Sequence, residues 1–141
     1  MSGKNQYPFT ANWQSTNPQT NFNPVPSIYG GGSQPSGVLT GAMASTNVIY
    51  SNIFEISRMD NIGFDVSWSG TPTGTLLVLV SNGGVVWPEL TFSPALSQPA
   101  GSAAFYALSL NQLPFKYVMF QYTNSSGTGV LTINGQCRDL N

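Results

Sequence analysis

The sequence predicts an all-β protein: an antiparallel β-sandwich with a jelly-roll-like arrangement of strands, preceded by an extended N-terminal arm. Three observations predict this fold class. Short apolar and β-branched runs are separated by Gly, Pro, Asn and Ser about every 8–15 residues, a spacing typical of sandwiches and jelly rolls. Several of these runs alternate apolar and polar residues with period two. No stretch shows the apolar period of a long amphipathic helix.

The arm is predicted over residues 1–45, where the composition differs from the rest of the chain. This segment holds half of the ten prolines and the run Gly30-Gly31-Gly32, and such a composition rarely builds a core of its own. It also carries aromatic residues, which we expect to lie against another surface, either the chain's own domain or a neighbouring subunit. These candidate interface residues are Tyr7, Phe9, Trp13, Phe22 and Tyr29. Removal of residues 1–29 is then expected to leave the β-sandwich domain, residues 46–141, folded.

The first half of that domain contains three predicted strands. Residues 47–56 are rich in β-branched and aromatic side chains, which favours a strand over a helix. Residues 62–68 alternate strictly, with Ile, Phe, Val and Trp on one face, and therefore predict a strand with one buried face. After a turn at residues 71–74, the continuous apolar run at residues 76–81 predicts a strand buried on both faces.

The second half begins with the strongest hairpin signal in the chain. Residues 81–84 read Ser-Asn-Gly-Gly, and Asn-Gly tolerates the positive φ of a tight hairpin, so residues 85–87 are expected to return as a strand. Further strands are predicted at residues 103–110, 117–123 and 130–134. The turns between them lie at residues 111–114 and 124–129.

The composition argues against several classes of function. The 141 residues include no histidine, one cysteine, four basic and five acidic side chains, and the net charge is −1. General acid–base and nucleophilic catalysis depend on such groups, so we expect no enzyme and no cofactor. A nearly neutral chain has no field to attract nucleic acid or an anionic membrane. Residues 1–12 lack the apolar core of a secretory signal, so synthesis in a cytoplasm is expected.

The few candidate chemical groups have simpler interpretations. A glycosidase needs two carboxylates across a sugar bond, and Asp60 with Asp65, or Asp65 with Glu89, are the pairs to consider. A turn residue and a solvent-facing strand residue explain Asp60 and Asp65 equally well, and we favour that interpretation. No loop has the carboxylate density of a Ca²⁺ site, so no metal is expected. The single Cys137 is expected to be an idle thiol, with an intermolecular bridge as the alternative.

Exposed aromatic and amide side chains are the stronger functional signal. Trp68 is in phase with the apolar face of residues 62–68 and is expected in the core. Trp87, together with Asn82 and Asn124 in predicted turns, is a candidate contact residue. Two partners are open for Trp87: a neighbouring subunit, which we favour, or a receptor or carbohydrate on which an indole ring can stack.

Two stretches together carry a resemblance. Residues 68–74 read W-S-G-T-P-T-G, and they are followed by Ser81-Asn82, by N-Q-L-P at residues 111–114 and by S-G-T-G at residues 126–129. This ordered set resembles a pattern in small bacteriophage virion structural proteins and covers roughly residues 58–134. The resemblance implies a virion protein that decorates or cements the capsid, or forms part of a vertex or spike. Its expected partners are copies of itself and other capsid proteins, in a homo-oligomer; the alternative is a receptor- or carbohydrate-binding β-sandwich module.

Overall fold

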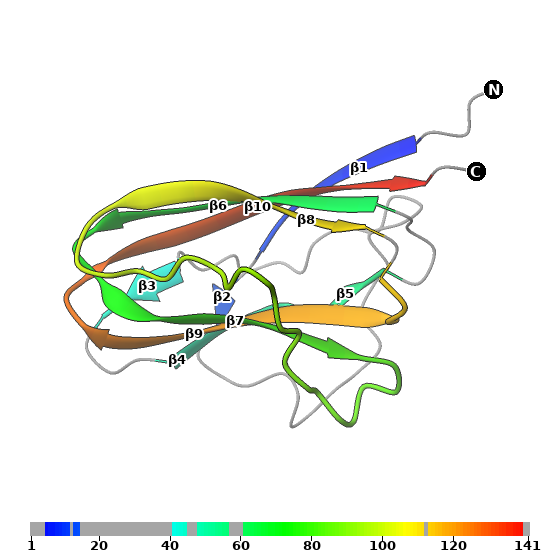
Figure 1. Cartoon of the computed structure of the whole chain (residues 1–141), viewed down its shortest axis with the longest axis horizontal. Coiled ribbons are helices and arrows are strands. Elements are labelled where there is room, and N and C mark those ends of the chain that lie inside the picture. The colour runs from blue at the N-terminus through cyan, green and yellow to red at the C-terminus, as the bar shows by residue number, and fades with distance from the viewer. Residues whose placement is uncertain are drawn as a thin grey trace.

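A computed structural model describes residues 5–11, 13–14, 41–44, 48–56, 61–111 and 113–139 of the chain. The described elements are strands that lie in two layers facing each other (Figure 1). They are β1 (Asn5–Thr10), β2 (Trp13–Gln14), β3 (Gly41–Met43), β4 (Val48–Ser51), β5 (Phe54–Glu55), β6 (Asn61–Gly70), β7 (Thr73–Ser81), β8 (Ala104–Asn111), β9 (Tyr117–Ser126) and β10 (Gly129–Asp139). Among these residues, no helix is long and apolar enough to cross a membrane.

The first layer, sheet A, is built on β10. Strand β6 pairs along one side of β10, and β8 pairs with the far side of β6. The other side of β10 is shared, because β3 pairs with residues 129–131 and β1 pairs with residues 134–139. All of these pairings are antiparallel.

The second layer, sheet B, is built in the same way on β9. Strand β7 pairs along the whole of one side, while β4 and β5 share the other side. Strand β2 adds outside β4. Outside β7, the segment 88–90 forms backbone hydrogen bonds from Val80 N to Pro88 O at 3.0 Å and from Leu90 N to Val78 O at 2.8 Å.

The chain crosses between the two sheets at every connection from β6 to β10. Strands β6, β8 and β10 lie in sheet A, and β7 and β9 lie in sheet B. This alternation, with neighbours in each sheet drawn from distant parts of the chain, is the arrangement of a jelly roll. The predicted all-β sandwich is therefore confirmed.

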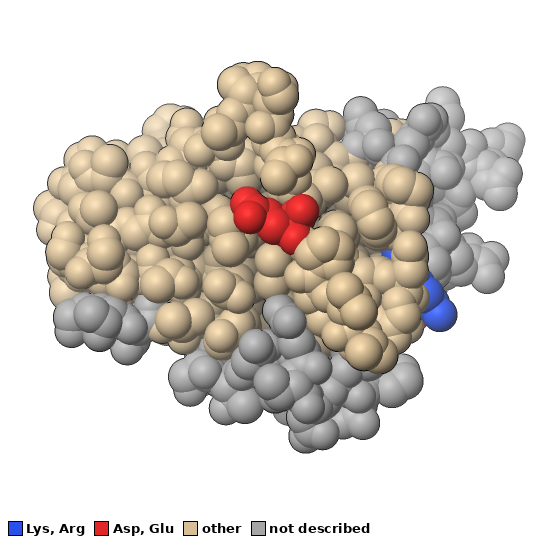
Figure 2. All heavy atoms as spheres, turned by 60° about the horizontal axis from the view of Figure 1, so that its bottom comes forward, with Lys and Arg blue, Asp and Glu red and all other residues tan. Residues whose placement is uncertain are grey.

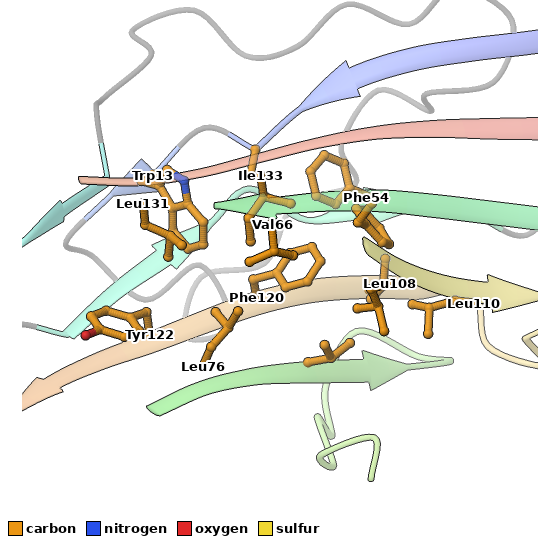
Figure 3. Packing of buried hydrophobic residues seen from close by; sticks show 14 of the residues in the cluster. Trp13, Phe54, Val66, Leu76, Leu108, Leu110, Phe120, Tyr122, Leu131 and Ile133 are labelled. Atoms are coloured by element: carbon orange, nitrogen blue, oxygen red, sulfur yellow. The ribbon is translucent and has the colours of Figure 1, made fainter. Parts of the chain in front are cut away.

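The core lies between the sheets and follows the period-two pattern of the sequence. The inward side chains of β6 are at most 5% exposed, and Trp68 is among them as predicted. Phe64 of sheet A meets Phe120 of sheet B edge to face, with ring centroids 4.9 Å apart. Figure 3 shows how side chains of both layers interdigitate there. The fully buried members include Phe54, Val66, Leu76, Val78, Val118, Phe120, Tyr122, Leu131 and Ile133.

Sheet B is also buried on part of its other face. Leu79 and Met119 point away from the main core and form a second apolar cluster with Ile53 and Tyr117. Leu79 is 5% exposed and Met119 is fully buried. The prediction that the apolar run in β7 is buried on both faces is thus confirmed, and a continuous apolar run is what such a strand requires.

The N-terminal segment enters both sheets. Strand β1 pairs with β10 over six residues, and Ala11 N continues the contact with a 2.9 Å hydrogen bond to Ile133 O. Trp13 is 3% exposed and belongs to the main core cluster (Figure 3). This aromatic residue of the predicted arm therefore packs against its own domain, one of the two surfaces that the sequence left open. Tyr7 and Phe9 lie in β1, opposite Cys137 and Gly135. Phe22 and Tyr29 lie outside the described residues.

The predicted tight hairpin at residues 81–84 differs from the structure. The positive φ lies at Gly84 rather than at Gly83, and the return partner of β7 is residues 88–90 rather than 85–87. Ser81 Oγ accepts a 2.8 Å hydrogen bond from Gly84 N, so a side-chain oxygen closes the turn between residues 81 and 84. Trp87 then folds back on the loop, so residues 85–87 are held away from the ladder.

Candidate interaction surface

Residues 82–88, here called the valine loop, follow the end of β7 and form a compact, apolar projection. In Figure 1 this stretch is the green trace that leaves the arrowhead of β7 and extends beyond the sheets. At its tip, Val85 is 83% exposed and Val86 is 71% exposed. Isolated exposed apolar side chains are common, but adjacent ones at a projecting tip are typical of an interaction site.

The loop is held in one conformation by contacts with the sheet and with itself. The Trp87 indole N–H donates to Gly84 O at 3.2 Å, and its ring lies 6.4 Å from that of Tyr117. Lys116 N donates to Asn82 Oδ1 at 3.1 Å, which joins the loop to the start of β9. A surface that is already ordered loses less conformational entropy on binding. The predicted contact residues Asn82 and Trp87 therefore lie together and support the valines rather than form the tip.

A hollow of about 300 Å³ lies beside the tip. Its lining is mainly apolar and consists of Ser81, Asn82, Gly83, Val85, Val86, Pro88 and Phe115. The Lys116 Nζ lies 5.4 Å from the Tyr117 ring centroid, close enough for a cation–π contact at the edge of this region. Two exposed valines and a mainly apolar hollow thus lie side by side on this surface.

Asn124, the third predicted contact residue, is not brought to this surface. It lies seven positions along β9 from Tyr117, which is about 24 Å at the rise of an extended strand. Its side chain is 1% exposed, accepts a hydrogen bond from the Tyr122 hydroxyl and donates one to Gly127 O. Its amide thus satisfies the turn between β9 and β10 and is turned away from solvent.

The carboxylates do not form a catalytic pair in the described part of the chain. Asp65 is exposed on β6 in sheet A, whereas Glu89 is exposed beside β7 in sheet B. Asp60 lies outside the described residues. Within the described ranges, no group of three His, Cys, Asp or Glu side chains is placed to hold a metal ion. Figure 2 shows that most of the described surface in that view is neither acidic nor basic.

Sequence reasoning missed Val85 and Val86 as surface residues because it placed them in a return strand. The available signal was Pro88, which lacks the N–H that a ladder needs and follows directly after Trp87. Proline is accepted at the first residue of a strand, so Pro88 favours a return strand that begins at residue 88 and not at residue 85. Phe105 was missed as well. It is 84% exposed on β8, and the sequence predicted only a strand there, without assigning a role to its outward face.

No protein-family model matches the chain, and no curated protein matches it. Among solved structures, the fold is similar to that of the SPBc2 prophage-derived protein YomS, with 16% identity, a TM-score of 0.44, and coverage of 71% of this chain and 89% of that one. It is also similar to part of latent PorU from Porphyromonas gingivalis, with 12% identity and a TM-score of 0.44, covering 98% of this chain and 13% of that one. A third similarity is to the enzymatically active domain of bacteriophage CBA120 tailspike protein 4, with 10% identity and a TM-score of 0.44, covering 99% of this chain and 20% of that one.

Proposed function

We propose that this protein is a structural protein of a bacteriophage virion, which decorates or cements the capsid or forms part of a vertex or spike. The observation that carries the proposal is the valine loop, which presents Val85 and Val86 to solvent on an ordered support. Its partners would be copies of this chain and other capsid proteins. The ordered set of short motifs that resembles small phage virion proteins supports the same assignment.

The energetics of the loop suit adhesion. Burying a valine side chain that was exposed contributes about 1.5–3 kcal/mol, so two adjacent valines add appreciable affinity at each contact. A net charge of −1 leaves little repulsion between copies packed side by side. Few charged groups must lose their water when such a surface associates. This desolvation cost often cancels the electrostatic gain where an interface relies on ion pairs.

The proposal is tested by the composition of purified particles of the virus that encodes the chain. We expect the double variant Val85→Asp and Val86→Asp to fold, because both side chains are exposed, and to be lost from particles. The matched control is Thr75→Asp, which places a carboxylate at an exposed position near the opposite end of β7. The proposal is supported if the control is present in particles at the unmodified copy number and the double variant is absent from them. Incorporation of the double variant at the unmodified copy number, or absence of the unmodified protein from intact particles, overturns it.

A further inference from the structure

The outer face of sheet A carries a second hollow, remote from the valine loop in the fold. It has a volume of about 540 Å³, within the range of roughly 300–1,000 Å³ found for small-molecule sites. It lies over the middle of three adjacent strands, β8, β6 and β10. Its outward-facing lining residues are Gly63, Asp65, Ala107, Ser109, Asn134 and Gln136.

The strand register explains how these residues meet. Asp65 pairs with Ala107 on one side and with Asn134 on the other, so the three form one row across the sheet. Gly63 pairs with Ser109 and Gln136 in the next row. Polar side chains from all three strands thus border a floor made by the small residues Gly63 and Ala107. The hollow is a consequence of pairing between residues far apart in the sequence.

No feature of the described fold requires glycine at position 63. It lies inside a long strand, where glycine is unfavourable, and it is not among the glycines with positive φ. The pairing on both sides of it is continuous, without a bulge. A Cβ added at this position would meet nothing within 4 Å in the described part of the chain, so packing there does not require glycine either. A glycine in a strand interior often marks a place where a ligand approaches the backbone.

The chemistry around the floor fits a neutral sugar. A carboxylate accepts hydrogen bonds from two neighbouring hydroxyl groups, and the amides of Asn134 and Gln136 both donate and accept. Phe105 projects from the same face of β8 and is 84% exposed, which offers an apolar ring to the C–H face of a pyranose. Asp65 disfavours an anion, and the described residues hold no cluster of carboxylates that would bind a metal ion.

We propose that the hollow at Gly63 and Asp65 binds a neutral saccharide through Asp65 and its neighbours in sheet A. This assigns glycan recognition to the outer face of sheet A and not to Trp87. The inference uses a different surface from the proposed function. Failure of one can therefore be distinguished from failure of the other, because the Val85 and Val86 variants are expected to bind sugar normally.

The test is a titration of the isotope-labelled full chain with methyl glycosides of glucose, galactose, mannose and N-acetylglucosamine, and then with short neutral oligosaccharides of the same sugars. We expect saturable shifts of the backbone amide signals of Gly63, Asp65 and Ala107 with at least one of these probes. Asp65→Asn is expected to weaken binding roughly tenfold, because it removes the charge-assisted hydrogen bonds but keeps the shape of the side chain.

Gly63→Val is the decisive variant. It places a branched side chain on the floor of the hollow, its Cβ meets no described atom within 4 Å, and it replaces glycine by a residue that favours strands, so the unfolding temperature of the variant is expected not to fall. Loss of binding in this variant therefore reports occupation of the hollow and not unfolding. The matched control is Thr75→Val, an exposed strand position on sheet B, which is expected to bind like the unmodified chain.

Four outcomes overturn the inference. The first is the absence of saturable shifts at Gly63 and Asp65 with every probe. The second is unchanged affinity in Gly63→Val, and the third is a set of shifts centred on Trp87 instead. The fourth is a change in oligomeric state or particle incorporation of Gly63→Val without sugar binding by the unmodified chain, which would assign the hollow to a contact between subunits.

Discussion

The hydroxyl of Tyr122 donates a 2.8 Å hydrogen bond to Oδ1 of Asn124, two residues further along β9. Both side chains are buried, and Asn124 Nδ2 in turn donates to Gly127 O at 3.0 Å. The core of the sandwich is therefore linked through one amide to the turn between β9 and β10. This link explains why a polar residue is buried at the end of a strand, since a buried amide must have its hydrogen bonds satisfied.

Replacement of Tyr122 by Phe is expected to destabilise the fold. The change leaves Oδ1 of Asn124 buried without its donor, which costs about 1–3 kcal/mol in the free energy of unfolding. Denaturant-induced unfolding measures the difference. Tyr106→Phe is the matched control, because the buried Tyr106 hydroxyl has no hydrogen-bond partner among the described residues and its removal is expected to be neutral or slightly stabilising. Equal losses in the two variants would contradict a special role for the Tyr122–Asn124 bond.

Stability is expected to decrease at alkaline pH. Burial raises the pKa of Tyr122 from 10.0 to about 12 and also raises the pKa of Tyr106. A raised tyrosine pKa means that the folded chain keeps a proton that the unfolded chain releases above pH 10. The free energy of unfolding is therefore constant with respect to these groups below that pH and falls as the pH rises toward 12. Unfolding measured across this interval should show a shallower decrease in Tyr122→Phe, and an unchanged slope would argue against Tyr122 as its source.

Gly127 is expected to tolerate no side chain. It has a φ of +73°, which L-residues disfavour, and an added Cβ would overlap the backbone carbonyl of Thr71. The left-handed conformation alone costs about 1–2 kcal/mol, so Gly127→Ala should lower the free energy of unfolding by at least that amount. Gly83→Ala provides the comparison, because a Cβ there meets nothing within 4 Å and no positive φ is involved. Thermal unfolding that ranks the two variants equally would contradict this view of the turn.

Removal of residues 1–14 is expected to destabilise the domain. The deletion strips β1 from β10 and removes Trp13 from the core, and loss of a buried tryptophan side chain alone typically costs about 3–5 kcal/mol. This expectation is opposite to the one drawn from the sequence, in which the domain survives without residues 1–29. Comparison of the free energies of unfolding of the truncated chain, Trp13→Ala and the full chain checks it. A truncated chain as stable as the full one would restore the view of a separable arm.

Strand identity was largely readable from the sequence. The alternation at residues 62–68 and the apolar run at residues 76–81 became β6 and β7, because each reflects the burial of one strand by its immediate surroundings. The absence of histidine and the small number of charged side chains are read from the composition alone and need no structure. Of the candidate contact residues, Asn82 and Trp87 both lie in the valine loop, whereas the side chain of Asn124 is buried at the turn between β9 and β10.

Composition and period-two alternation are enough to predict short strands with one apolar face and few groups for catalysis. The burial of Trp13 in the core, the pairing of residues 88–90 with β7, and the hollow that Gly63 and Asp65 share with Asn134 follow from how distant segments pack in the folded chain. The physical reason is that period-two patterning records which face of a strand is buried. It does not record which distant strand lies beside it, and both surfaces proposed for binding arise from such pairings.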